Sequence, residues 1–135
     1  MVPLGQARLA REGTDVTLVA YGAMVPVCER AADALEGEAS VEVLDLRSLR
    51  PLDEDALLAS AAKTGRVVVV QEAPRTAGFG AEIAAILAEK AILDLHGPVI
   101  RVTGFDVPYP YWKIEDRYMP SAERVVNACR RLLEF

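Results

Sequence analysis

The sequence contains few of the residues from which metal centres and catalytic triads are built. It has a single histidine, His96, and two cysteines, Cys28 and Cys129. One imidazole and two thiols far apart in the chain do not form a structural zinc site, and no Gly-x-Ser-x-Gly motif accompanies His96. We therefore expect both cysteines to be buried small apolar residues within helices, and His96 to be a loop or helix C-terminal residue.

Long apolar runs and an excess of basic residues are also missing. No stretch approaches the ~18 consecutive apolar residues of a membrane span, and the start of the chain lacks the basic and apolar regions of a signal peptide. The chain has 15 basic and 20 acidic residues, a net charge of -5, which argues against nucleic acid as a partner. We expect a cytoplasmic protein that binds no membrane and no nucleic acid. The acidic balance suits a basic protein partner, although solubility explains it equally well.

Hydrophobic residues make up 52% of the chain, enough for one packed domain over residues 1–135. Short β-rich runs alternate with amphipathic helical stretches, and Val67–Val70 is the strongest signal for a strand buried on both faces. The predicted strands are Gln6–Arg11, Val16–Ala20, Val41–Leu46, Val67–Val70 and Val99–Thr103. The predicted helices carry Val25 to Leu35, Ala56 to Ser60, Ile83 to Ala91 and Val125 to Leu133. Asp53 caps the start of the second helix and Ser121 that of the fourth. The first three helices are expected to end at Gly37, Gly65 and Gly97-Pro98, and a loop spans Glu72–Phe79 before the third. This pattern predicts an α/β domain with a mainly parallel sheet covered by helices on both faces.

Two groups of residues near predicted strand ends could bind an anion. The guanidinium groups of Arg47 and Arg50, with Arg75, match carboxylate and phosphate, but solvated or locally paired arginines are the favoured explanation. The backbone N–H groups of the loop with Gly78 and Gly80 precede a helix and could also hold an anion. Ile83 stands where a dinucleotide fingerprint has its third small residue, so a tight strand-to-helix turn is favoured over a cofactor site. A regulatory domain that binds small anions therefore remains an alternative function.

The segment with Tyr109, Tyr111 and Trp112 places three large rings close together. Its two prolines, Pro108 and Pro110, exclude a regular helix or a central strand. The rings could anchor a protein interface or cover the core of their own domain, and the sequence supports both interpretations.

A set of short motifs occurs in a characteristic order along nearly the whole chain. The motifs are Val2-Pro3-Leu4-Gly5, Arg11 to Thr17, Tyr21-Gly22, Asp45-Leu46-Arg47, Pro51-Leu52-Asp53, Gly65-Arg66, Glu72 to Thr76, Gly78 to Ile83, Val102 to Asp106 and Pro108-Tyr109-Pro110. Together they resemble the C-terminal domain of the E1 β subunit of thiamine-diphosphate-dependent 2-oxo acid dehydrogenases, in the transketolase C-terminal domain family. The resemblance implies a three-layer α/β/α fold with a five-stranded, mostly parallel sheet and one antiparallel edge strand, here Gln6–Arg11.

The resemblance also implies what the chain does not do alone. The parent enzyme decarboxylates a 2-oxo acid, with a branched-chain substrate favoured and pyruvate next, and acylates a lipoyl group on E2. Thiamine diphosphate and magnesium would bind in parts of the parent outside this sequence, so we expect no catalytic, cofactor or metal residues here. Met1 before Val2-Pro3 then resembles an added start on a domain excised from a larger β subunit.

By the same resemblance, the domain associates subunits and docks E2. Its expected partners are the E1 α subunit, a second E1 β subunit and the peripheral subunit-binding domain of E2. In some pyruvate dehydrogenases a terminal β-subunit phenylalanine contacts that basic E2 domain, which makes Phe135 a docking candidate, with Glu89 and Asp94 as acidic candidates. The chain departs from the family at Gln71, where a histidine is usual, and at Ala77, where a glycine is usual.

Overall fold

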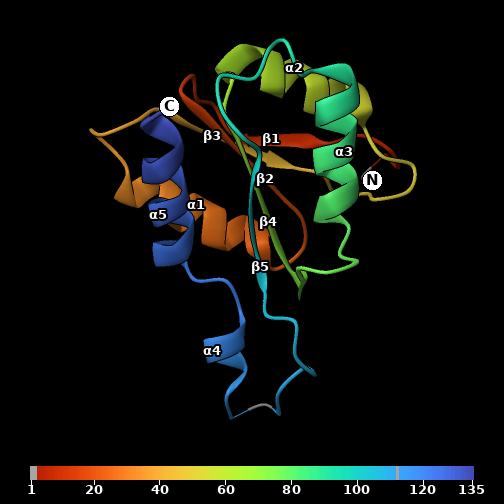
Figure 1. Ribbon diagram of the computed structural model, residues 1–135, viewed down its shortest axis with the longest axis vertical. Coiled ribbons are helices and arrows are strands. Elements are labelled where there is room, and N and C mark those ends of the chain that lie inside the picture. The colour runs from red at the N-terminus through yellow and green to blue at the C-terminus, as the bar shows by residue number, and fades with distance from the viewer. Residues whose placement is uncertain (1–2, 112) are drawn as a thin grey trace.

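The computed structural model of the chain, which describes residues 3–111 and 113–135, contains a five-stranded sheet between two layers of helices (Figure 1). The strands are β1 (Arg8–Arg11), β2 (Val16–Ala20), β3 (Val41–Asp45), β4 (Val67–Pro74) and β5 (Ile100–Gly104). The helices are α1 (Met24–Ala34), α2 (Glu54–Thr64), α3 (Gly80–Lys90), α4 (Glu115–Tyr118) and α5 (Ala122–Leu133). The strand order is β1-β3-β2-β4-β5, and β1 is antiparallel to β3 while the other pairs are parallel. The expected fold class and the antiparallel edge strand are confirmed.

The two helix layers cover opposite faces of the sheet because neighbouring strand residues point to opposite sides. On β4, Val68 and Val70 pack in the core under α1 and α5, whereas Val67 and Val69 pack in the core under α2 and α3. This double burial explains the unbroken valine run. Both cysteines are buried in the layer formed by α1 and α5, as expected.

Several helix ends follow the predicted capping chemistry. The Asp53 carboxylate accepts a hydrogen bond from the Ala56 N–H at 3.1 Å, and the Ser121 hydroxyl accepts one from the Arg124 N–H at 3.2 Å. Gly65 ends α2 with a φ of 66°, a left-handed conformation that favours glycine. A Cβ at Gly65 would also lie 2.3 Å from the His96 ring, so this position requires glycine for two reasons.

Two predicted boundaries are wrong. The third helix was expected to run to Gly97-Pro98, but α3 ends at Lys90 because Ala91 leaves the helical conformation. The following connection instead passes the C-terminal end of α2, where the His96 N–H donates to the Gly65 carbonyl at 2.7 Å. The loop expected from Glu72 begins only after Pro74, because β4 continues past an irregularity to pair Pro74 with Gly104. In both places tertiary pairing outweighs the local pattern.

Smaller differences concern the ends of the other elements. β1 begins two residues later than predicted, β3 ends one residue earlier, and β5 is displaced by one residue toward the C-terminus. α4 is a short helix that the proline and aromatic pattern did not predict. Within residues 3–111 and 113–135, no helix is long and apolar enough to cross a membrane.

Candidate functional site

The chain between β5 and α5 extends away from the sheet at its carboxyl end, the lower end in Figure 1. Tyr118 of α4 is buried there, and its ring centroid lies 5.1 Å from that of Tyr109 and 6.4 Å from that of Phe105. Tyr111 projects into solvent, with 89% of its surface exposed. The segment therefore combines rings that cover Tyr118 with an exposed aromatic surface. Trp112, also predicted as an interface residue, lies outside the described residues.

The glycine loop before α3 is organised by the buried side chain of Gln71. Its amide oxygen accepts hydrogen bonds from the Gly80 N–H and, at 3.3 Å, from the Tyr21 hydroxyl. Its amide nitrogen donates to the Pro74 carbonyl at 2.9 Å. A Cβ at Gly78 would lie 2.1 Å from that nitrogen, so the loop needs glycine to approach Gln71. The amide oxygen thus occupies the start of α3, where the sequence suggested an external anion.

The arginines considered as an anion site do not converge. Arg47 lines a hollow of about 490 Å³ together with Arg8, and its Nε lies 3.9 Å from a carboxylate oxygen of Asp45. Arg50 does not line this hollow and is exposed. Arg75 instead reaches the β5 edge, where it donates to the Arg101 carbonyl. Arg47 is therefore a locally paired arginine within the described part of the chain.

The docking candidates lie at the other end of the domain, where α3 and α5 finish (Figure 1). Phe135 is 69% exposed, and a Cβ at Gly97 would lie 3.1 Å from its Cβ, so the two residues are in close contact. Asp94 lies in the same connection as Gly97, and Glu89 lies in the last turn of α3. Leu93 beside Asp94 is 96% exposed. This end thus presents apolar and acidic side chains together.

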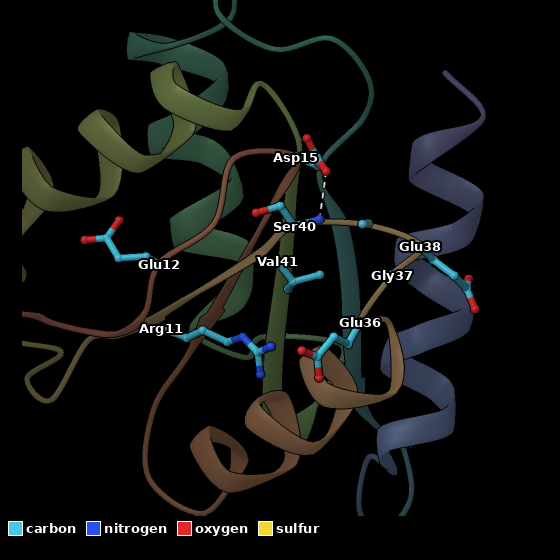
Figure 2. A pocket seen from close by; sticks show the side chains of 9 residues that line it. Arg11, Glu12, Asp15, Glu36, Gly37, Glu38, Ser40 and Val41 are labelled. Atoms are coloured by element: carbon cyan, nitrogen blue, oxygen red, sulfur yellow. Dashed lines mark hydrogen bonds between the residues drawn. The ribbon is translucent and has the colours of Figure 1, made fainter.

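An acidic hollow of about 440 Å³ opens between the β1–β2 turn and the α1–β3 connection (Figure 2). Three of its four carboxylates have partners in the protein. Asp15 accepts from the Ser40 N–H at 2.7 Å, Glu12 pairs with Lys63, and Glu38 pairs with Arg130 of α5 at 2.8 Å. These contacts join loops and helices, which gives the hollow a structural explanation.

A buried polar cluster under α2 escaped the sequence analysis. The Glu42 carboxylate of β3 is 1% exposed, lies 2.5 Å from the Lys63 Nζ and 3.3 Å from the Thr17 hydroxyl. Thr17 in turn shares a hydrogen bond with Thr64 at 2.9 Å. The sequence offered one indication of this cluster, the charged Glu42 within a strand that is otherwise rich in apolar residues. Its partners could not be identified without the register that places α2 over β2 and β3.

The described residues offer no evident catalytic or metal-binding chemistry. Among residues 3–111 and 113–135, no three histidine, cysteine, aspartate or glutamate side chains are grouped so that they could hold a metal ion. Burial raises the pKa of the Cys28 thiol, with a smaller contribution from Cys129, and raises the pKa of Cys129 to about 12. Both thiols are therefore protonated near neutral pH and unsuited to nucleophilic attack.

Comparison with known protein families finds a match to the model of the transketolase C-terminal domain over residues 5–125. A pyruvate dehydrogenase E1 component subunit beta from Leifsonia xyli subsp. xyli is 49% identical over 135 residues, covering 99% of this chain and 40% of that protein. The protein of the same name from Staphylococcus epidermidis is 47% identical and is covered to 42%. The chain thus spans about two fifths of the length of these relatives.

Solved structures show the same architecture. A split gene transketolase, described as an inactive beta4 tetramer, superposes with a TM-score of 0.83 and 34% identity, covering 96% of this chain and 42% of that chain. A 2-oxoglutarate:ferredoxin oxidoreductase from Magnetococcus marinus matches with a TM-score of 0.62 over 95% of this chain and 19% of that chain. Its identity is only 15%, so it supports the fold alone.

Proposed function

The chain belongs to the family of transketolase C-terminal domains, and from this membership we propose that it is the subunit-association and E2-docking domain of a pyruvate dehydrogenase E1 β subunit. The observation that carries the proposal is the 47–49% identity to proteins of that name over 99% of the chain. The parent would decarboxylate pyruvate oxidatively and acylate a lipoyl group on E2. These relatives favour pyruvate over the branched-chain substrate that the sequence motifs favoured.

The start of α3 does not fit the diphosphate of thiamine diphosphate, and the described residues offer no group of side chains for magnesium. The start of α3, the natural position for a diphosphate, is occupied by the Gln71 amide oxygen, and no metal-binding group of side chains is found within the described ranges. We assign both cofactors to other parts of the parent, and we propose that this domain is not catalytic alone.

The surface around Phe135 is our candidate for E2 docking. The exposed Phe135 ring lies against Gly97, in the connection that also carries Asp94 and the exposed Leu93, and Glu89 lies in the helix before that connection. Aromatic anchors surrounded by charged groups are typical of small, specific interfaces. The carboxylates suit a basic partner, such as the peripheral subunit-binding domain of E2.

The opposite end of the domain is our candidate for association with the E1 α subunit and a second E1 β subunit. Tyr109 and Tyr111 are 60% and 89% exposed, and Val107 and Ile114 nearby are also exposed. Such a concentration of exposed apolar side chains is typical of a protein interface. The distance between the two ends would allow both partners to bind at once (Figure 1).

Calorimetry with an isolated E2 peripheral subunit-binding domain tests the docking proposal. We expect Phe135→Ala to weaken binding by about tenfold or more, as for other aromatic anchors. Tyr111→Ala is the matched control, because it removes an exposed ring at the opposite end, and it should leave the affinity unchanged. Equal affinities of the Phe135→Ala and unmodified chains would remove Phe135 from the docking surface.

Two further measurements test the other parts of the proposal. In an assembled E1 that contains this chain, Tyr111→Ala should increase subunit dissociation measured by light scattering, and Phe135→Ala should not. The chain alone, given thiamine diphosphate, magnesium, pyruvate and an electron acceptor, should show no turnover. Measurable turnover would contradict a non-catalytic domain.

A further inference from the structure

The outer edge of β5 is capped by arginine side chains. β5 is the last strand of the sheet, so among the described residues its outer side has no neighbouring strand. Arg75 donates to the Arg101 carbonyl at 3.1 Å, and Arg124 donates to the Thr103 carbonyl at 2.7 Å. The Arg101 side chain donates in return to the Arg75 carbonyl at 3.1 Å. Guanidinium groups thus satisfy edge carbonyls that would otherwise invite another strand.

Two hollows follow this edge and meet at Arg101 and Arg124. The first, of about 310 Å³, is bordered by Arg75, and the second, of about 210 Å³, is bordered by Arg131 of α5. We call the whole feature the β5-edge arginine groove, defined by Arg75, Arg101, Arg124 and Arg131. Four positive side chains converge here although the chain carries a net charge of -5.

One buried hydrogen-bond donor in this groove lacks an acceptor among the described residues. Nη1 of Arg124 is buried, and within the described part of the chain it has no hydrogen-bond partner. The same guanidinium lies 4.9 Å from the centroid of the Phe105 ring, and burial lowers the pKa of Arg124. Because a buried donor without a partner is costly, this nitrogen is suited to an acceptor supplied by a ligand.

One carboxylate, that of Asp106, lines the groove among the described residues. Within the same part of the chain, the four arginines of the groove form no salt bridge with aspartate or glutamate. Asp106 accepts from the Thr76 N–H at 2.9 Å and from the Thr76 hydroxyl at 2.6 Å. These bonds hold Asp106 against the neighbouring loop and lower its pKa, with smaller contributions from the backbone and the positive charge of Arg75. Asp106 thus offsets part of the charge of Arg75, and the other three arginines keep theirs.

We propose that the β5-edge arginine groove binds a small multivalent oxyanion, such as a diphosphate or a tricarboxylate. Guanidinium groups present planar pairs of N–H donors that match the oxygens of phosphate and carboxylate. A small ligand fits better than an added peptide strand, because a strand would have to displace Arg75 and Arg124 from the carbonyls of Arg101 and Thr103. This site is distinct from Arg47 and from the Phe135 surface, and it does not depend on the docking role.

Isothermal titration calorimetry of the 135-residue chain tests the proposal with pyrophosphate and citrate as probes, at an ionic strength held constant with sodium chloride. Saturable binding with one anion per chain is expected for at least one probe, and the comparison of the two separates phosphate from carboxylate ligands. Arg101→Gln and Arg131→Gln should each weaken binding by about tenfold, since each removes charged hydrogen bonds. Arg131→Gln keeps the test valid if loss of the Arg101–Arg75 contact disturbs the fold.

Two control variants remove one positive charge outside the groove, and so separate binding in the groove from a general effect of net charge. Arg30→Gln on α1 and Arg47→Gln at the other hollow should leave binding unchanged. The proposal is overturned if neither probe binds up to about 10 mM, a free energy near -3 kcal/mol. It is also overturned if all four variants weaken binding equally, or if an oligoglutamate peptide binds while pyrophosphate and citrate do not.

Discussion

The amide oxygen of Gln71 accepts a hydrogen bond from the backbone N–H of Gly80, the first residue of α3. This contact gives the glycine loop before the helix a structural role. A Cβ at Gly80 would lie 2.8 Å from the same oxygen, and Gly78 is crowded from the other side of the amide. The glycines therefore accommodate a buried amide that joins the end of β4 to the start of α3.

Replacement of Gln71 tests this role in stability. Gln71→Leu leaves the Gly80 N–H without its acceptor, and we expect the free energy of unfolding in urea to fall by about 2–4 kcal/mol. Gln71→His, which introduces the residue usual in the family, should lose less because imidazole can both accept and donate. The exposed Gln6→Leu is the matched control and should change stability by less than about 0.5 kcal/mol. If Gln71→Leu lowered the free energy of unfolding no more than Gln6→Leu does, Gln71 would not stabilise the loop before α3.

Ala77 has a φ of 58°, in the left-handed region that favours glycine. We expect Ala77→Gly to raise the free energy of unfolding by about 0.5–1 kcal/mol, measured by urea denaturation, since relief of backbone strain exceeds the added flexibility of the unfolded chain. Ala81→Gly, four residues further along on the exposed side of α3, is the opposite control and should cost about 1 kcal/mol. Destabilisation by both substitutions would show that Ala77 is unstrained.

The buried carboxylate of Glu42 makes the stability depend on Lys63. Lys63→Met should destabilise the protein, because it leaves a nearly inaccessible charge without its ammonium partner. The double variant with Glu42→Met should recover much of the loss, since no buried charge then remains. Lys90→Met is the control, because its partner Glu54 is exposed and such surface pairs contribute little. The measurement is thermal denaturation. Equal changes in melting temperature for Lys63→Met and Lys90→Met would contradict the importance of the Glu42–Lys63 pair.

The raised pKa values of the two thiols predict a loss of stability in alkali. Native Cys129 keeps its proton up to a pKa of about 12, whereas the unfolded thiol loses its proton near pH 8.5. The native state therefore binds more protons, and stability should fall as the pH rises above about 8.5, by up to about 1.4 kcal/mol per pH unit for each thiol. Urea denaturation between about pH 8 and pH 10 measures this slope.

Removal of the thiols isolates their part of the pH dependence. Cys28→Ala and Cys129→Ala should flatten the decline even though each cavity lowers stability at every pH. Lysines that titrate at higher pH contribute equally to all these proteins, so the difference in slope belongs to the cysteines. Identical slopes with and without the thiols would mean that burial does not shift their titration.

The layered fold was predictable because it follows from local patterns. The valine run at Val67–Val70 requires burial on both faces, and the caps at Asp53 and Ser121 satisfy N–H groups only a few residues away. The end of α3 and the length of β4 were not predictable. Both depend on residues distant in sequence, through the His96–Gly65 hydrogen bond and the pairing of Pro74 with Gly104.

The candidate surfaces were likewise predictable from the sequence only in part. Family motifs and residue types singled out Phe135, Tyr109 and Tyr111, and the structure describes them at two opposite ends of the domain. The motifs also drew attention to Gly78 and Gly80, but not to Gln71 as the group that fills their loop. Arg101 and Arg124 attracted no attention, because an arginine in a strand and one in an amphipathic helix both resemble ordinary surface residues.

By itself, the sequence determined the α/β layering, the helix caps, the family and the scarcity of catalytic side chains, because these depend on composition and on neighbours within a few positions. Only the tertiary structure decided which polar groups are buried and which charges meet. Glu42 with Lys63, and Arg75 with Arg101 and Arg124, are brought together by sheet register and helix packing. Hydrogen bonds and charge interactions act over a few ångströms of space, whatever the separation along the chain.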